Sequence, residues 1–577
     1  MRTFLGVVLL VLGMPILLVG AVVAVVVGPD DTVDVITETV ESESTALVIS
    51  PSVLGVSGLT LHVAAEVDGP ETFVGAAHPV HVSSYLDGVA HIEVSDINRS
   101  REVTLTEIPA GGDEIPLPPP NALDWWQTKT SGAGLQELEV ELTDEPVAVV
   151  VSAAEPAPPL TTTVTAALGW DGLFIAAVLV GVLGLALVVL GFLARRSGRQ
   201  RKHARLEAAR DARAPGNHHD DVADTTPGVD QPGDGSPPPP TPLRPYRPSS
   251  MRPPPPPPRG DEGRSRRIVG AVLPVTALLA GGCAAIPQSV DTASSPLVAA
   301  TPEQNESFFA AYTETNNAAN AAQDPQSLMP IETGPQLAAS EFGFEVERAQ
   351  DIAPTEPFTV SPTALAAPQF ESYPLFYVSS ATIGGSTTSH YLLTRPTARE
   401  PWRAAAVVDL TEDQPFDLVA TVTSSPSIAD AGDAGLAALD VVREYAETGQ
   451  APEGLDITAA GSLADLPGLG YSADPEAEGI ASLTRACEIG LPVDGAWLET
   501  SSGALTIATA TCTQELQTDE GYWFTPDAPY GTIPGGVDIT ATTVTAVVPF
   551  IAQVSDDGTV VAHGGRLSLT QTDAVTR

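Results

Sequence analysis

The sequence predicts a multidomain membrane protein with α-helical transmembrane spans, an exported all-β, sandwich-like domain and a C-terminal α+β region. Three observations support this class. Two apolar runs are long enough to cross a bilayer, short alternating strands fill the segment between them, and from about residue 300 helices followed by strands occur twice. A chain of 577 residues has room for roughly three or four domains.

The apolar run at 173–193 sets the orientation of the chain. As a helix, about twenty apolar residues span a hydrocarbon core of about 30 Å. A basic tail follows directly: Arg195, Arg196, Arg199, Arg201, Lys202, Arg205, Arg210 and Arg213. Because such clusters stay in the cytoplasm, we expect this helix to cross from outside to inside, leaving residues 194–267 cytoplasmic.

The first apolar run, residues 4–28, follows a single basic residue, Arg2. It is longer than the roughly 7–15-residue core of a secretory signal, so we expect a retained span. Two spans place residues 29–171 outside the cell. In the second run, Ala177, Gly181 and Gly184 share one helix face, which either packs on the first span or a partner or faces lipid.

The segment 29–171 has the pattern of a β domain. Apolar and polar residues alternate over 59–67, 103–106 and 138–142, and 147–151 is short and β-branched. Gly- and Pro-rich turns separate these runs. Six to eight short strands of this kind predict a β-sandwich.

Low-complexity, proline-rich sequence follows the basic tail and predicts an extended, disordered linker up to residue 267. Three arginines then precede the apolar stretch 268–286, which contains Cys283 in the string Leu279-Ala280-Gly281-Gly282-Cys283. Two interpretations stay open: a lipoprotein-type signal with lipidation at Cys283, or a third span kinked at Pro274. Both place residues 288–577 outside the cell.

The C-terminal region divides into two related halves, residues 300–425 and 433–572. Thr301-Pro302-Glu303-Gln304 begins a helix with Thr as N-cap, Pro at N1 and Gln at N3. Further helices are predicted at about 336–349, from Gly435 to Gly449, and at 475–487, with strands after each pair. Asp557-Gly558 predicts a hairpin turn between the last two strands. The element order suggests tandem α+β cones of the NTF2-like kind.

Two stretches resemble uncharacterised envelope proteins of actinobacteria. One is the run 73–88 with Leu123-Asp124-Trp125-Trp126 downstream; the other comprises 308–312, 331–335 and 402–410. The resemblance covers most of residues 1–200 and 300–570. The chain resembles two such proteins joined by the proline-rich linker: a two-span protein with an exported β domain, and a lipoprotein-like exported domain. It implies an envelope location and transfers no catalytic residue.

Composition and motifs exclude several functions. A net charge of −45 argues against a nucleic-acid-binding protein. The only lysines, Lys129 and Lys202, do not follow glycine as a phosphate-binding loop requires, and no zinc-protease or serine-hydrolase motif is present. We therefore name no catalytic, cofactor-binding or metal-binding residue.

Three groups of side chains remain to be placed. His62, His78, His81 and His91 are either loop or surface residues or a metal site. Trp125-Trp126 is either a platform for carbohydrate or lipid headgroups, or one core residue and one rim residue. Cys487 and Cys512 would join the short helix to a strand by a disulfide, or stay buried thiols.

These observations predict a multi-pass protein of the cell membrane that contacts membrane lipid and has no enzymatic role: a binding or scaffolding module outside the cytoplasm. Its expected partners are envelope proteins or cell-wall material. The alternative is an enzyme that acts on an envelope substrate inside an NTF2-like cavity, because such cones host both roles.

Overall fold

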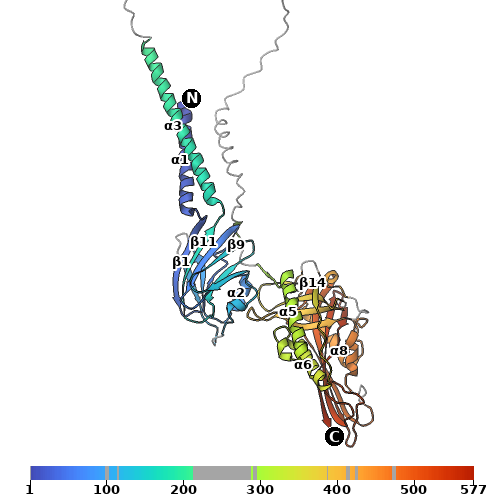
Figure 1. The fold of residues 1–577 in the computed structure, drawn as a ribbon. Helices are drawn as coiled ribbons and strands as arrows, with labels where there is room; N and C mark the ends of the chain where they lie inside the picture. Colours follow the sequence, from blue (N-terminus) through green and yellow to red (C-terminus); the bar gives the residue numbers. More distant parts are fainter. Residues whose placement is uncertain are drawn as a thin grey trace, which may run out of the picture. The chain divides into compact units, whose positions relative to one another are not determined.

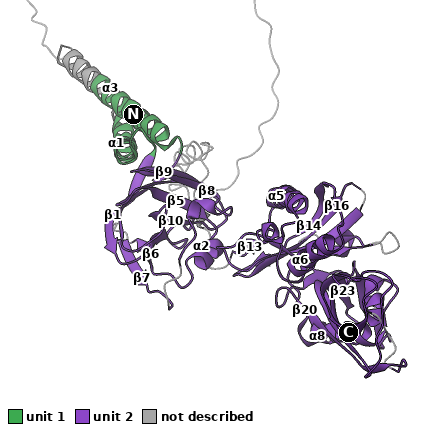
Figure 2. Cartoon of the chain, turned by 60° about the horizontal axis from the view of Figure 1, so that its bottom comes forward, with its two compact units in different colours: residues 1–31, 171–286 green, residues 32–170, 287–577 purple. Residues whose placement is uncertain are grey.

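The computed structural model describes residues 2–97, 103–112, 116–211, 288–289, 295–385, 387–410, 416–422, 426–470 and 476–577 (Figure 1). It divides into two compact units, 1–31 with 171–286 and 32–170 with 287–577 (Figure 2). The predicted linker from residue 212 onward, the apolar stretch 268–286 and Cys283 lie outside the described residues.

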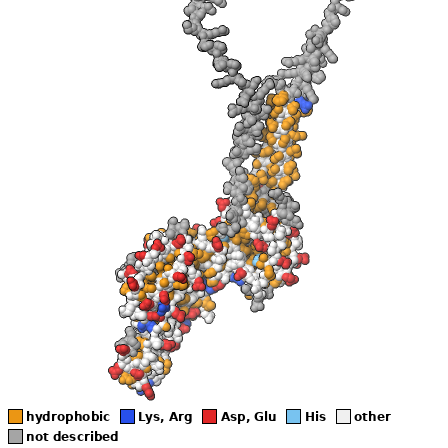
Figure 3. Space-filling model, turned by 180° about the vertical axis from the view of Figure 1, so that it is seen from behind, with side chains coloured by type: hydrophobic (Ala, Val, Ile, Leu, Met, Phe, Trp, Pro, Cys, Tyr) orange, Lys and Arg blue, Asp and Glu red, His pale blue; other side chains and the backbone are white. Residues whose placement is uncertain are grey.

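The first unit contains two long helices, α1 (Arg2–Val27) and α3 (Leu173–Asp211). Each is long and apolar enough to cross a membrane: the stretch Phe4–Val27 has a mean hydropathy of 2.9, and Leu173–Ser197 has 3.1. Most of their large apolar side chains are exposed, and Figure 3 shows the resulting hydrophobic surface. Exposed apolar side chains over this length are what a lipid environment would cover.

Glycines bring α1 and α3 into close contact. A Cβ atom built on Gly20 would lie 2.4 Å from the backbone nitrogen of Gly181, and one built on Gly184 would lie 2.3 Å from that of Leu17. No side chain fits at these distances, so the small residues are required for the backbones to approach. The small-residue face of α3 therefore packs on α1.

Residues 32–170 form a sandwich of two sheets. The first sheet is antiparallel, in the order β1-β11-β4-β9: β1 Thr32–Ser42, β11 Leu160–Gly169, β4 Leu59–Val67 and β9 Gln136–Leu142. The second has the order β7-β6-β2-β10-β5-β8: β7 Val103–Ile108, β6 His91–Ile97, β2 Ala46–Ile49, β10 Ala148–Ala153, β5 Thr72–Ala77 and β8 Thr128–Gly132. In this second sheet β2 and β6 pair in parallel, whereas the other described pairs are antiparallel.

The core of the sandwich lies between these sheets. Leu61 and Val63 of β4 contribute from one sheet, and Val149 and Val151 of β10 from the other. Strands β4 and β9 bury every second residue, whereas β10 is buried almost throughout. The alternating runs and the β-branched run of the sequence thus form strands of these two kinds.

Three short elements complete the domain: β3 (Val56–Ser57), which pairs with β12 (Gln288–Ser289), the helix α2 (Pro79–Tyr85) and the 3₁₀ turn η1 (Pro120–Ala122). Helix α2 is absent from the sequence-based expectations. His78 caps it, because its side chain accepts a hydrogen bond from the backbone N–H of Val80, and Pro79 occupies the first turn.

The first C-terminal lobe consists of helices followed by an antiparallel sheet. Its helices are α5 (Pro302–Ala322), η3 (Pro325–Leu328) and α6 (Gly334–Ala349). Its main sheet has the order β14-β16-β17-β18: β14 Val360–Ala366, β16 Leu375–Ile383, β17 Thr387–Arg395 and β18 Arg403–Asp409. A small sheet pairs β13 (Leu297–Val298) with β15 (Gln369–Phe370). The predicted capping box of Thr301 and Gln304 is present at the start of α5.

The second lobe repeats the order of helix and sheet. It contains α7 (Leu418–Thr421), α8 (Gly432–Thr448) and η4 (Gly461–Gly468). Its seven strands follow the path β19-β24-β23-β22-β20, with β21 on β22 and β25 on β23: β19 Leu455–Asp456, β20 Ile480–Gly490, β21 Leu498–Thr500, β22 Gly503–Thr518, β23 Ile539–Ser555, β24 Val560–Gly564 and β25 Ser568–Thr576. The turn between β23 and β24 contains Gly558 with a positive φ of 86°, as the Asp-Gly pair predicted.

The prediction of a helix at 475–487 is wrong. Residues 480–490 form strand β20, which pairs with β22 along its length. Ile480, Leu483 and Cys487 follow one another at helical spacing, which produced the error. Cross-strand pairing with β22 overrides that local pattern, since β propensity depends on the neighbouring strand.

The two lobes share a hydrophobic core. Phe309 and Tyr391 of the first lobe belong to the same buried cluster as Leu498, Ile507 and Ile551 of the second. The side chain of Gln350 also donates a hydrogen bond to the backbone oxygen of Gly531, at 2.7 Å. The C-terminal region is therefore one continuous packed body.

Candidate functional site

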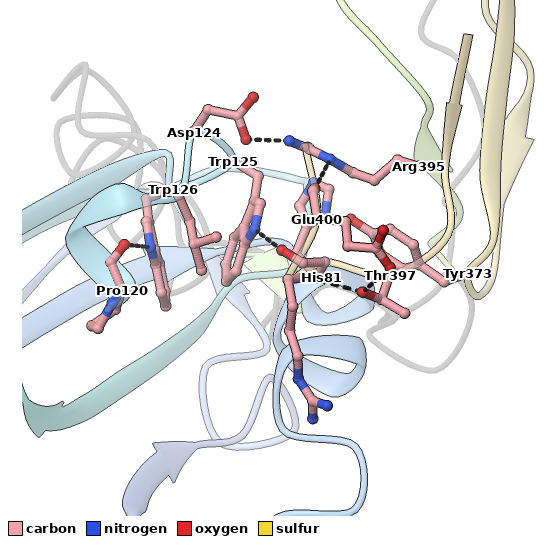
Figure 4. Close-up of polar contacts among 12 residues, drawn as sticks. His81, Pro120, Asp124, Trp125, Trp126, Tyr373, Arg395, Thr397 and Glu400 are labelled. Carbon is pink, nitrogen blue, oxygen red and sulfur yellow. Dashed lines mark hydrogen bonds and ion pairs between the residues drawn. The ribbon is translucent and has the colours of Figure 1, made fainter. Parts of the chain in front are cut away.

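The loop between β17 and β18, residues 396–402, contacts the β-sandwich and is called the docking loop here (Figure 4). Pro396 cannot continue the hydrogen bonding of β17, so the strand ends at Arg395. The loop then turns back on itself, because the backbone N–H of Glu400 donates to the oxygen of Thr397. This turn presents the backbone of Ala398 to the other domain.

Ala398 is held by two hydrogen bonds from the β-sandwich. The indole Nε1–H of Trp125 donates to its carbonyl oxygen at 2.7 Å, and its own N–H donates to Oγ of Ser84 at 3.0 Å. Ala398 has no exposed surface and belongs to the same buried cluster as Trp125 and Tyr85. Both polar groups of this buried residue are therefore satisfied by the partner domain.

An aromatic group surrounds this contact. The ring of His81, on α2, stacks on Trp125 with centroids 5.2 Å apart and an interplanar angle of 24°. Its Nδ1 lies 2.7 Å from the hydroxyl oxygen of Tyr373, in the first C-terminal lobe. Burial, followed by the charge of Arg395 and the neighbouring His78, lowers the pKa of His81 to about 3. His81 is therefore neutral at physiological pH and joins the two domains as an uncharged hydrogen-bonding ring.

Two arginines of the C-terminal region reach the β-sandwich. Arg395 pairs with the carboxylate of Asp124, donates to the backbone oxygen of Glu400 at 2.9 Å, and lies over the ring of Trp402 at 5.2 Å from its centroid. Its side chain is 3% exposed, whereas that of Asp124 is 63% exposed. The ion pair thus stabilises a guanidinium that is otherwise buried.

Arg399, in the docking loop, donates to two backbone oxygens of the sandwich. Its Nε contacts the oxygen of Tyr85 at 3.0 Å, and a terminal nitrogen contacts that of Asp87. These acceptors lie at and just after the last turn of α2, where backbone oxygens lack helical partners. The loop therefore closes the end of a helix that belongs to the other domain.

The structure places both tryptophans of the Trp125-Trp126 pair in buried positions, at 3% and 8% exposed. Trp126 packs on Phe73 inside the β-sandwich and donates to the backbone oxygen of Pro120 at 2.8 Å. Trp125 is covered by the docking loop. The expected rim position is therefore wrong, because a segment more than 270 residues downstream covers it.

The four histidines separate into different environments. His78 and His81 lie at α2, His62 faces Glu139 at 3.4 Å, and His91 lies 2.8 Å from the backbone oxygen of Val89. Among the described residues, no group of three or more His, Cys, Asp or Glu side chains is arranged to hold a metal ion. The histidines thus do not converge on one site in the described part of the chain.

A disulfide joins Cys487 and Cys512, which face each other across the β20–β22 pair. It therefore links two strands, not the expected helix and strand. It lies in the core of the second lobe, away from the docking loop.

Residues 296–461 match a family model described as a domain of unknown function (DUF8094). The matched segment includes the first lobe with its docking loop, and extends through α8 past the boundary expected at 425–433. No curated protein and no solved structure matches the chain.

Sequence reasoning predicted neither the docking loop nor α2. The available signals were weak: Pro396 after a strand-like run, and Pro79 behind His78 in a stretch that alternation did not fit. Neither signal identifies its partner, because the contact joins residues about 300 positions apart.

Proposed function

We propose that this chain is a multi-pass membrane protein of the cell envelope and serves as a non-enzymatic binding or scaffolding module outside the cytoplasm. Helices α1 and α3 would anchor it in lipid. The basic residues after the second span support a cytoplasmic location for 194–267, which leaves 29–171 and 288–577 outside. The resemblance to actinobacterial envelope proteins supports the same location.

The observation that carries the proposal is the contact between the docking loop and the β-sandwich. Trp125, Ser84 and Arg399 together satisfy backbone groups of the opposite domain, and Arg395 pairs across the contact with Asp124. Buried aromatic and arginine side chains of this kind are the residues that dominate protein–protein binding. The two extracytoplasmic regions would thus act as one assembled surface.

The alternative, an enzyme with its active site inside an NTF2-like cone, is less well supported. The two C-terminal lobes have the element order of such cones, which favours that fold. Phe308, Phe309, Tyr312 and Tyr391 pack between helix α5 and the sheet of the first lobe, and the remaining space is a cavity of about 230 Å³ at the junction with the second lobe. The fold alone cannot choose between the two roles, and the sequence contains no hydrolase or zinc-protease motif, so the structural role is the better supported.

A cysteine pair tests the docked arrangement in intact cells. Ser84→Cys and Ala398→Cys replace two residues whose Oγ and N atoms are 3.0 Å apart, which brings their Cα atoms to within the roughly 4–7 Å that a disulfide needs. The chain also carries Cys283→Ser and a thrombin site in the proline-rich linker. After oxidation of intact cells, lysis and thrombin cleavage, we expect one band on a non-reducing gel.

The matched control combines Ser84→Cys with Asp557→Cys, on the exposed turn between β23 and β24. It should give two bands after cleavage. Two bands from the Ser84–Ala398 pair as well would show that the regions are not docked in the cell, and the scaffold proposal would lose its main support.

A further inference from the structure

A cavity of about 230 Å³ lies at the junction of the two C-terminal lobes. Helices α5 and α6 contribute to its lining, as do strands β18, β22 and β23. The lining residues that bear on its chemistry are Tyr312, Phe358, Tyr391, Asp409, Thr509 and Arg566. The cavity is separate from the docking loop and takes no part in the contact described above.

Two opposite charges line this cavity. Asp409 ends β18, and its carboxylate accepts a hydrogen bond from the hydroxyl of Ser389. The turn that carries Arg566 packs against the end of the same strand: a Cβ atom on Gly565 would lie 3.0 Å from Cγ1 of Val408. Among the described residues no ion pair joins Asp409 to Arg566. Arg566 is exposed, so its guanidinium is hydrated and available at the open side of the cavity, whereas Asp409 is half-buried.

A buried hydroxyl in the wall also lacks a partner. Thr509 lines the cavity and is 2% exposed, yet its Oγ1 makes no hydrogen bond to any described residue. Buried polar atoms are nearly always hydrogen-bonded, so this hydroxyl is an exception in the wall. Its oxygen has almost no accessible surface, so the ligand chemistry of the cavity rests on its two charged residues.

Two tyrosines, Tyr312 and Tyr391, line the cavity together with the carboxyl group of Asp409. The hydroxyl of Tyr312 donates to Oε1 of Glu332 at 2.8 Å. Burial raises the pKa of Tyr391, and the carboxyl groups of Asp409 and Glu332 raise it further. Aromatic faces next to carboxylates attract an ammonium group, whereas the free guanidinium of Arg566 suits a carboxylate.

We propose that this cavity binds a small zwitterion, a free amino acid or a dipeptide, with its ammonium group at Asp409 and its carboxylate at Arg566. A molecule that carries both charges would form an ion pair with each of these two residues, which line one cavity but do not pair with each other. This site is a ligand-binding function that the scaffold proposal does not require.

The experiment is isothermal titration calorimetry of the purified full chain in detergent. The probes are L-alanine, D-alanine and L-alanyl-L-alanine, with ethylamine and propionate as analogues that carry a single charge. We expect at least one zwitterion to bind with a dissociation constant below about 10 mM, and the single-charge analogues to bind at least about tenfold more weakly.

Two variants locate the binding. Arg566→Gln and Asp409→Asn should each weaken binding of that zwitterion by about tenfold or more. Arg443→Gln, on α8, is the matched control, because its side chain is paired with Asp440 and Glu447 outside the cavity. Binding by none of the three zwitterions, or binding unchanged by both cavity variants, would overturn the proposal while leaving the docked arrangement of the domains unaffected.

Discussion

Asp124 is the residue best suited to test the contact between the docking loop and the β-sandwich, because its side chain is largely exposed whereas that of its partner Arg395 is buried. Asp124→Asn removes the charge of the acceptor and leaves the β-sandwich core unchanged. A hydrogen bond to a charged group contributes about 1.5–3 kcal/mol, and exposure of the carboxylate reduces this through solvent screening to about 1–2 kcal/mol. The opening equilibrium of the docking loop should therefore rise roughly 5–30-fold.

Hydrogen exchange of the intact chain measures this opening directly. The N–H of Ala398 donates to Oγ of Ser84 across the contact, so exchange at this amide requires the docking loop to leave the β-sandwich. We expect its exchange to accelerate roughly 5–30-fold in Asp124→Asn. The control, Asp68→Asn, removes an exposed carboxylate from the turn after β4 and should leave exchange unchanged. Equal exchange in the two variants would refute the energetic role assigned to the ion pair.

Three further predictions concern pH, the disulfide and the spans. His81 has a folded-state pKa of about 3, below its unfolded value of 6.5, so the released state binds more protons between these values and docking weakens as pH falls below 6.5. The free energy of docking falls by about 2 kcal/mol at about pH 5. Hydrogen exchange of the docking loop, corrected for intrinsic rates, should accelerate accordingly, and His81→Gln should abolish this pH dependence. Replacing Cys487 and Cys512 with serine opens a loop of 25 residues and should lower the stability of the second lobe by about 3.5 kcal/mol in denaturant titration, whereas an unchanged midpoint would contradict this role. Gly20→Leu should separate α1 from α3 at Gly181 and abolish oxidative cross-linking between cysteines placed in the two helices, with retained cross-linking counting against the packing described.

Local patterns predicted much of the secondary structure. The alternation at 59–67 and the capping box at Thr301 are short-range signals, and the structure has β4 and α5 at these positions. The same short-range reasoning failed at 475–487, where Ile480 and Leu483 have helical spacing but pair with β22. Periodicity reports which side chains share a face, and it does not report which neighbour covers that face.

The contact between the docking loop and the β-sandwich could not be predicted from local patterns for the same reason. Trp126 packs on the ring of Trp125, but nothing near Trp125 in the sequence indicates which carbonyl group accepts its indole N–H. Arg395 contacts Glu400 and Trp402 close by in the chain, but nothing there indicates its pairing with Asp124. Their contacts with Ala398 and Asp124 span more than 270 residues. Only the three-dimensional arrangement brings these four residues together.

The most direct test of the proposed arrangement is the sidedness of both folded regions. In a Cys283→Ser background, single cysteines replace Glu43 in the β-sandwich, Asp527 in the second lobe and Ser249 in the linker. A membrane-impermeant maleimide added to intact cells should label the cysteines at positions 43 and 527, and should label the one at position 249 only after lysis. Labelling at position 249 in intact cells, with positions 43 and 527 protected, would contradict the account.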